Sequence, residues 1–168
     1  MSASSPHTSP SAATQLRGFI AKFDREHQAL IRSVRAALRR RLPTAVELVY
    51  DNYNFFVIGY GPTERPSDAI LSIAAGASGV GLCFVHGAKL ADPGRVLLGA
   101  GKQTRFVRLP AAKTLNQPEV AALITAAIKN APMPFARTGR GRLIIRSVSA
   151  KQRPRKTPTT KRNRTPAR

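Results

Sequence analysis

Apolar residues over the range 16–42 recur mostly at intervals of three and four, the spacing that places side chains on one face of a helix. This pattern predicts a single amphipathic helix over residues 16–42, which ends at Pro43 because proline cannot continue a helix. Proline is also favoured as the first residue of a helix, so we predict a second, shorter helix over residues 43–51, PTAVELVYD. The helical pattern returns after Asn116, which is a good N-cap residue, and predicts a third helix that ends before Pro132.

Apolar runs of strand length occupy most of the middle of the chain and are separated by loops rich in Gly, Pro and Ser. A further segment, residues 142–149, alternates arginine with apolar residues, which is typical of a partly exposed strand at a sheet edge. The predicted strands are therefore residues 55–61, 69–75, 80–86, 104–109 and 142–149.

Residues 69–88 contain no Asp, Glu, Lys or Arg over a length that could cross a bilayer. The same segment contains four glycines, and its central GASG is typical of a turn. We therefore predict two buried strands joined by a hairpin here, and we expect no membrane partner.

These elements predict an α+β protein with a mixed or antiparallel sheet of about five strands covered by about three helices. The length of 168 residues suits one domain with tails. We predict a disordered Ser- and Pro-rich tail over residues 1–13, a folded domain over residues 14–149 and a disordered Lys-, Arg- and Pro-rich tail over residues 150–168. The first tail lacks the pattern of a secretory signal, and the single cysteine, Cys83, fits a reducing compartment, so we expect a cytoplasmic location.

Positive charge dominates the composition, since 28 Lys and Arg residues against 8 Asp and Glu residues give a net charge of +20. Eight of these cations follow Ala150, and the rest of the chain is strongly basic without them. Such a charge is typical of weak, salt-sensitive binding to nucleic acid or another polyanion, although a purely solubilising tail would give the same composition. The candidate anion-binding residues are Lys102, Arg105, Arg108, Lys151, Arg153, Arg155, Lys156, Lys161, Arg162 and Arg164.

The loop GAGKQTR, residues 99–105, offers an alternative function. Gly-rich backbone can turn its N–H groups toward an anion, so the loop could hold a phosphorylated small molecule in an unrecognised enzyme. It is not a P-loop, because Val96 stands where that motif needs its first glycine and Gln103 replaces the hydroxyl residue. A glycine turn with solvated charges explains it more simply.

Few residues combine into a metal or catalytic site. Glu47 and Asp51 would share a face of the predicted second helix, but two carboxylates beside many arginines more often form salt bridges than a metal shell. Cys83 and His86 are three apart on a predicted strand and so point to opposite faces, too far apart for a nucleophile and its base. With no catalytic signature elsewhere, we predict a non-catalytic protein without a cofactor or metal.

Three strings carry a resemblance to a known family: residues 47–74 (ELVYDNYNFFVIGYGPTERPSDAILSIA), residues 81–109 (GLCFVHGAKLADPGRVLLGAGKQTRFVRL) and residues 142–155 (RLIIRSVSAKQRPR). In them the chain resembles the YdhG-like family of small bacterial proteins, a domain of unknown function, over about residues 16–155. The resemblance implies a soluble, cytoplasmic α+β domain whose mixed or antiparallel sheet is covered by helices. Some members are described as frataxin-like iron chaperones, a role that in frataxin depends on an acidic ridge along the first helix.

This chain departs from that acidic ridge. Its predicted first helix carries only Asp24 and Glu26 among acids, against eight cations: Arg17, Lys22, Arg25, Arg32, Arg35, Arg39, Arg40 and Arg41. Iron binding, with Glu47, Asp51 and Asp24 as ligands, is therefore an alternative hypothesis. The main prediction is a YdhG-like binding module with a basic tail that contacts polyanions, nonspecific nucleic acid above all.

Overall fold

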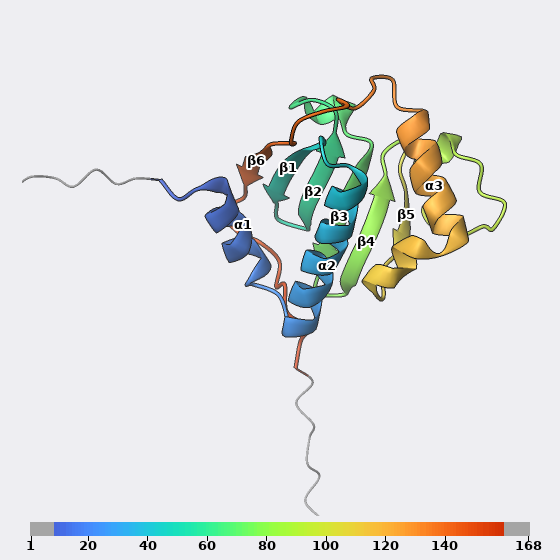
Figure 1. Ribbon diagram of the computed structural model, residues 1–168. Coiled ribbons are helices and arrows are strands. Elements are labelled where there is room, and N and C mark those ends of the chain that lie inside the picture. Colours follow the sequence, from blue (N-terminus) through green and yellow to red (C-terminus); the bar gives the residue numbers. More distant parts are fainter. Residues whose placement is uncertain (1–8, 160–168) are drawn as a thin grey trace, which may run out of the picture.

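The computed structural model describes residues 9–159, which form a mixed six-stranded sheet with three α-helices on one of its faces (Figure 1). The strand order is β5-β4-β3-β2-β1-β6, and neighbouring strands are antiparallel except β1 and β6, which are parallel. The predicted α+β class is thus confirmed, with β6 at a sheet edge as expected. The strands are β1 Val46–Asp51, β2 Phe56–Gly61, β3 Leu71–Gly76, β4 Gly79–Phe84, β5 Arg105–Arg108 and β6 Leu143–Val148.

The helices are α1 Ala12–Ile20, α2 Arg25–Arg41 and α3 Pro118–Lys129, with short 3₁₀ turns η1 Pro66–Asp68, η2 Gly87–Lys89 and η3 Ala112–Asn116. The prediction of one helix over residues 16–42 is wrong, because the chain turns between α1 and α2. The turn inserts the ring of Phe23 into the core, where it lies edge-on to Phe56 with 6.0 Å between ring centroids. The apolar pattern contains a sign of this break, since no apolar position continues the helical stripe between Phe23 and Leu30.

The predicted helix over residues 43–51 is also wrong, because Val46–Asp51 is strand β1, which lies next to edge strand β6. It pairs with β2 on one side and β6 on the other, which satisfies its backbone groups along both edges. Its valines and Tyr50 fit the pleated surface of a strand.

The core lies between the helices and the inner face of the sheet. Strands β3 and β4 alternate buried with less buried residues, and the buried positions pack against side chains from α1, α2 and α3. The predicted hairpin within residues 69–88 is confirmed as β3 and β4, joined at Ala77 and Ser78. Within residues 9–159 no helix has both the length and the hydropathy needed to cross a membrane.

Candidate functional site

Glu47, on the inner face of β1, is buried and bound by α2. The guanidinium of Arg35 donates to both of its carboxylate oxygens at 2.8 Å, and Arg39 Nε lies 3.7 Å from Oε1. The hydroxyl of Tyr60 donates to Oε2 at 3.2 Å. Burial, together with the charge of Glu47, raises the pKa of Tyr60 well above its usual value. Glu47 is therefore committed to an internal ion pair.

Asp51, at the other end of β1, is covered by the C-terminal segment. Arg155 Nη2 donates to Asp51 Oδ1 at 2.9 Å, and Lys22 Nζ lies 2.5 Å from Oδ2. The same guanidinium donates to the carbonyl oxygens of Asn52 and Asn54. The side chains of Arg155 and Asp51 are 2% and 1% exposed, so Arg155, a candidate anion contact in the predicted tail, is part of the protein interior.

Residues 149–157, which we name the C-terminal strap, lie across the end of the sheet. The backbone N–H of Arg153 donates to the carbonyl of Tyr53 in the β1–β2 turn, and the Thr157 hydroxyl donates to the carbonyl of Ala77 in the β3–β4 turn. The Thr157 N–H donates to Asp24 at the start of α2, and this hydrogen bond lowers the pKa of that carboxyl. The strap therefore belongs to the folded domain, beyond the predicted boundary at residue 149.

The other candidate cations of the predicted tail fall into two groups, those within the described residues and those beyond them. Lys151, Arg153 and Lys156 are exposed, and the guanidinium of Arg153 lies 6.0 Å from the centre of the Tyr53 ring. These three side chains are accessible to an anion. Lys161, Arg162 and Arg164 lie outside the described residues.

The three candidate residues near β5 do not form one cluster. Arg105 points to the inner side of β5, and its guanidinium donates to the carbonyl oxygens of Gly101 and Thr104 at 2.5 and 2.9 Å. The loop thus turns carbonyl oxygens toward a cation, the reverse of what a phosphate loop needs. Lys102 is exposed in the same loop, whereas Arg108 is exposed on the opposite face of β5.

The face of the sheet away from the helices, which we call the outer face, has small residues along its centre. One cross-strand row consists of Tyr50, Val57, Ala74, Gly81 and Arg108. The next row consists of Leu48, Gly59, Ser72, Cys83 and Phe106. The surface is consequently shallow in the middle, with larger side chains toward its margins.

Two phenylalanine rings lie on the outer face, at separate places. The ring of Phe106 rests against Gly99, where a Cβ atom would lie 3.6 Å from it, and the Arg108 guanidinium is 5.9 Å from the ring centre. The ring of Phe55 rests against Gly76 and is 53% exposed. The sequence contained one sign of this arrangement, since in the consecutive pair of residues 55 and 56 one ring must point outward when the other points into the core.

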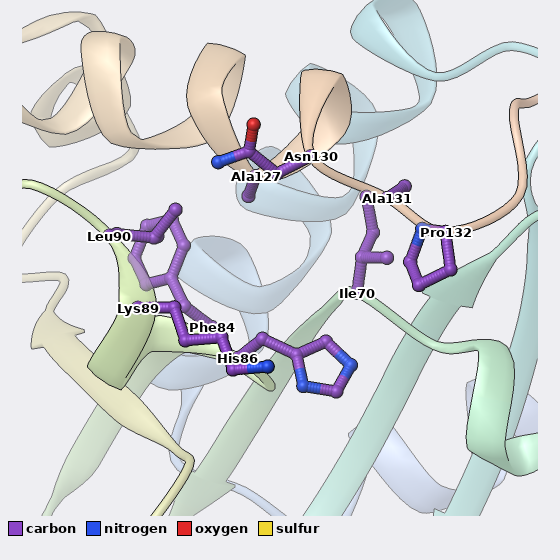
Figure 2. Close-up of a pocket in the computed structure, with 9 residues that line it drawn as sticks. All are labelled: Ile70, Phe84, His86, Lys89, Leu90, Ala127, Asn130, Ala131 and Pro132. Atoms are coloured by element: carbon purple, nitrogen blue, oxygen red, sulfur yellow. The ribbon is translucent and has the colours of Figure 1, made fainter.

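His86 lines a cavity of about 300 Å³ on the helix side of the sheet, between the end of β4, η2 and the end of α3 (Figure 2). We expected this histidine to be an ordinary strand-end residue. Cys83 lies on the outer face, where burial raises the pKa of its thiol and so disfavours the reactive thiolate. The two side chains are on opposite sides of the sheet, as their spacing predicted.

The acids considered as iron ligands are separated and already engaged. Glu47 and Asp51 share the inner face of β1, but each is held by an arginine, and Asp24 is bound by the strap. Among residues 9–159, no group of three or more His, Cys, Asp and Glu side chains is placed to hold a metal ion.

Comparison of the chain with protein-family models, with curated proteins and with solved structures gives no match.

Proposed function

We propose that this protein binds single-stranded nucleic acid without sequence preference, holding bases on the outer face of the sheet and phosphates with exposed cations. The observation that carries the proposal is the exposed Arg108 beside the Phe106 ring, on the face of the sheet opposite the three α-helices. Aromatic faces stack any base, and arginine adds both charge and stacking.

The charge balance supports a polyanionic ligand. The five ion pairs within residues 9–159 use only three acids, Glu47, Asp51 and Glu64. Since the whole chain has 8 acids for 28 Lys and Arg residues, internal acids cannot neutralise most of its cations. The excess attracts phosphates over distances of about a Debye length, roughly 8 to 10 Å in physiological salt.

The shape of the outer face favours a single strand over a duplex. Its central residues are small, so a backbone can approach closely, and the exposed ring of Phe55 and the half-buried ring of Phe106 offer surfaces on which unpaired bases can stack. In a duplex the bases are already stacked and would present only phosphates to the same cations. A duplex should therefore bind through charge alone.

The other hypotheses have less support. Iron binding would require Glu47 and Asp51 to leave their arginines, and the GAGKQTR loop presents carbonyl oxygens to Arg105. Membership of the YdhG-like family remains a proposal that the α+β architecture supports.

Fluorescence anisotropy of a labelled oligothymidine 20-mer, titrated with the full chain across a salt series, tests the proposal. We expect the Arg108→Gln substitution to weaken binding and to reduce the slope of log affinity against log salt by about 0.7, the value for one single-strand phosphate contact. The Phe106→Leu substitution should weaken binding several-fold and leave that slope unchanged, because stacking is worth about 1–3 kcal/mol per base.

The matched control is Arg32→Gln, which removes the same charge from the exposed side of α2, on the other side of the sheet. If Arg32→Gln and Arg108→Gln weaken binding equally, or if Phe106→Leu has no effect, the outer face is not the binding surface. A blunt duplex of the same length should be insensitive to Phe106→Leu.

A further inference from the structure

The cavity beside His86 has the size and construction of a small-molecule site. Its volume of about 300 Å³ would hold about ten water molecules at ~30 Å³ each and lies at the lower end of the range for ligand pockets. It exists because the last turn of α3 presents Ala127 to the sheet, and Ala131 follows, whereas earlier turns fill the core with larger residues such as Leu123 and Ile124.

Most of the wall is apolar. Ile70, Phe84, Leu90, Ala127 and Pro132 line it, and Figure 2 shows these side chains around the space, from β4, α3 and the segments that adjoin β3, η2 and α3. Such a wall selects a ligand with an apolar body, since transfer of that body from water contributes about 25 cal/mol per Å² of buried area.

The polar groups of the wall are few, and they favour a single negative charge. Only His86, Lys89 and Asn130 can form hydrogen bonds with their side chains, and none of the nine lining residues is an acid. Lys89 takes part in none of the five ion pairs within residues 9–159, so its charge has no internal partner there. One cation balances a carboxylate, whereas a phosphate dianion would need more positive charge than these residues supply.

The placement of these groups orients the ligand. The end of α3 carries the negative pole of the helix dipole, which repels an anion near Ala127 and Asn130. Lys89 lies in η2 and His86 directly precedes this turn as its N-cap, and in Figure 2 both lie across the cavity from Ala127. The charged group therefore belongs at the Lys89 side and the apolar body toward α3.

We propose that this cavity binds a small monocarboxylic acid, whose apolar body fills the space under α3 and whose carboxylate contacts Lys89 and His86. This site is independent of the nucleic-acid surface, because it lies on the helix side of the sheet and neither Phe106 nor Arg108 lines it. A smaller cavity of about 130 Å³ adjoins it through Ile70, His86 and Pro132; because Asp68 also lines this space, it would admit only a short neutral extension of the ligand.

The test is a titration of the ¹⁵N-labelled full chain, followed by ¹H–¹⁵N NMR spectra, with three probes: 3-phenylpropionate, the neutral 3-phenyl-1-propanol and phenyl phosphate. We expect 3-phenylpropionate to shift the amide signals of Ile70, His86 and Ala127 saturably, with a dissociation constant in the millimolar range. The alcohol should bind about tenfold more weakly because it lacks the charge.

Three variants separate specific binding from adventitious binding. Lys89→Met keeps the apolar stem and should reduce affinity for the acid about tenfold, while affinity for the alcohol is unchanged. Lys113→Met, in the exposed part of η3 and outside the cavity, is the matched control and should change neither. Ala127→Trp fills the space and should abolish binding of the acid and of the alcohol. If this variant does not fold, the comparison of Lys89→Met with Lys113→Met still tests the proposal.

Specific outcomes would overturn the proposal. Absence of saturable shifts with all three probes, equal affinity for acid and alcohol, or equal effects of the two lysine substitutions would each do so. Tighter binding of phenyl phosphate than of 3-phenylpropionate would also reject the monocarboxylate assignment.

Discussion

The two ends of strand β1 bury a carboxylate in the same way but neutralise it from different parts of the chain. Glu47 meets Arg35, which is 12 residues away on a helix of the same domain. Asp51 meets Arg155, which is 104 residues away in a segment whose composition resembles a disordered tail. The difference shows that a basic, proline-rich segment can be a structural part of the fold when one of its cations pairs with a buried acid.

The ends also differ in access to water. The side chain of Arg35 is 21% exposed and that of Arg155 is 2% exposed. Leaving a charge without its partner costs less folding free energy when that charge can reach water. The Asp51 end should therefore be more sensitive to substitution than the Glu47 end.

The largest effect is expected from Arg155→Ala, which leaves Asp51 buried beside only Lys22. Removing one partner of a buried ion pair costs about 3–5 kcal/mol, a large part of the roughly 5–15 kcal/mol that stabilises a domain. Urea unfolding followed by circular dichroism measures the change. A chain ending at Ala150 should be destabilised at least as much, because it loses Arg155 together with most of the strap.

The control for that prediction is a chain ending at Thr159, which keeps the strap and removes Lys161, Arg162, Arg164 and Arg168. Its unfolding midpoint should equal that of the full chain. If a chain ending at Ala150 unfolds at the same urea concentration as the full chain, the strap is not structural. For nucleic-acid binding, only the Thr159 truncation separates loss of tail charge from loss of the fold.

A smaller effect is expected from Glu47→Gln at the other end. The amide keeps one acceptor for Arg35 but removes the charge, and the arginine can turn to water, so we expect a loss of about 1–3 kcal/mol in unfolding free energy. An Arg35→Met/Glu47→Gln double variant measures the coupling between the two residues. Additive losses in that cycle would mean that the ion pair contributes nothing beyond packing.

Lys22→Met should change stability least among the ion-pair variants. The Lys22 side chain is 40% exposed, and Asp51 keeps Arg155 when Lys22 is removed. Exposed pairs are worth about 0–1 kcal/mol and are weakened by salt. A loss comparable to that of Arg155→Ala would reverse the order of importance assigned to the two cations.

The contact between the strap and Asp24 predicts a pH effect. The hydrogen bond from the Thr157 N–H lowers the folded-state pKa of Asp24 below its ordinary value of 3.8. The ionised carboxylate therefore contributes to folding stability above pH 3.8, and this contribution is lost as pH falls through the lower folded-state pKa. Asp24→Asn should therefore reduce stability at pH 6 slightly and flatten the decline of stability at acid pH. Parallel urea titrations at pH 6 and pH 3 test this, and an identical pH dependence in both proteins would contradict it.

Local patterns predicted several elements correctly. The glycine turn between two uncharged runs gave the hairpin of β3 and β4, the apolar pattern after Asn116 gave α3, although its N-cap is Gln117 and not Asn116, and the alternating arginines of residues 142–149 indicated edge strand β6. Each of these signals depends only on residues a few positions apart, so the sequence alone is enough to predict these elements.

Strand β1 could not be assigned in this way, because residues four apart share a face in a helix and also in a strand. The spacing of Glu47 and Asp51 fits both, and only the pairing of β1 with β2 and β6 decides. The cavity beside His86 could not be predicted from the sequence either. It forms where two alanines, at and just beyond the end of α3, meet residues from β4 and η2, and no motif links them.

The sequence by itself determined the α+β class, the excess of positive charge and the separation of Cys83 from His86, because composition and strand alternation are properties of the chain. Only the tertiary structure decided which cations remain accessible, that Arg155 is buried against Asp51, and that Phe106 and Arg108 meet on the face opposite the α-helices. The physical reason is that a charge is free or engaged according to which side chains the fold brings within a few ångströms, and sequence separation does not limit those encounters.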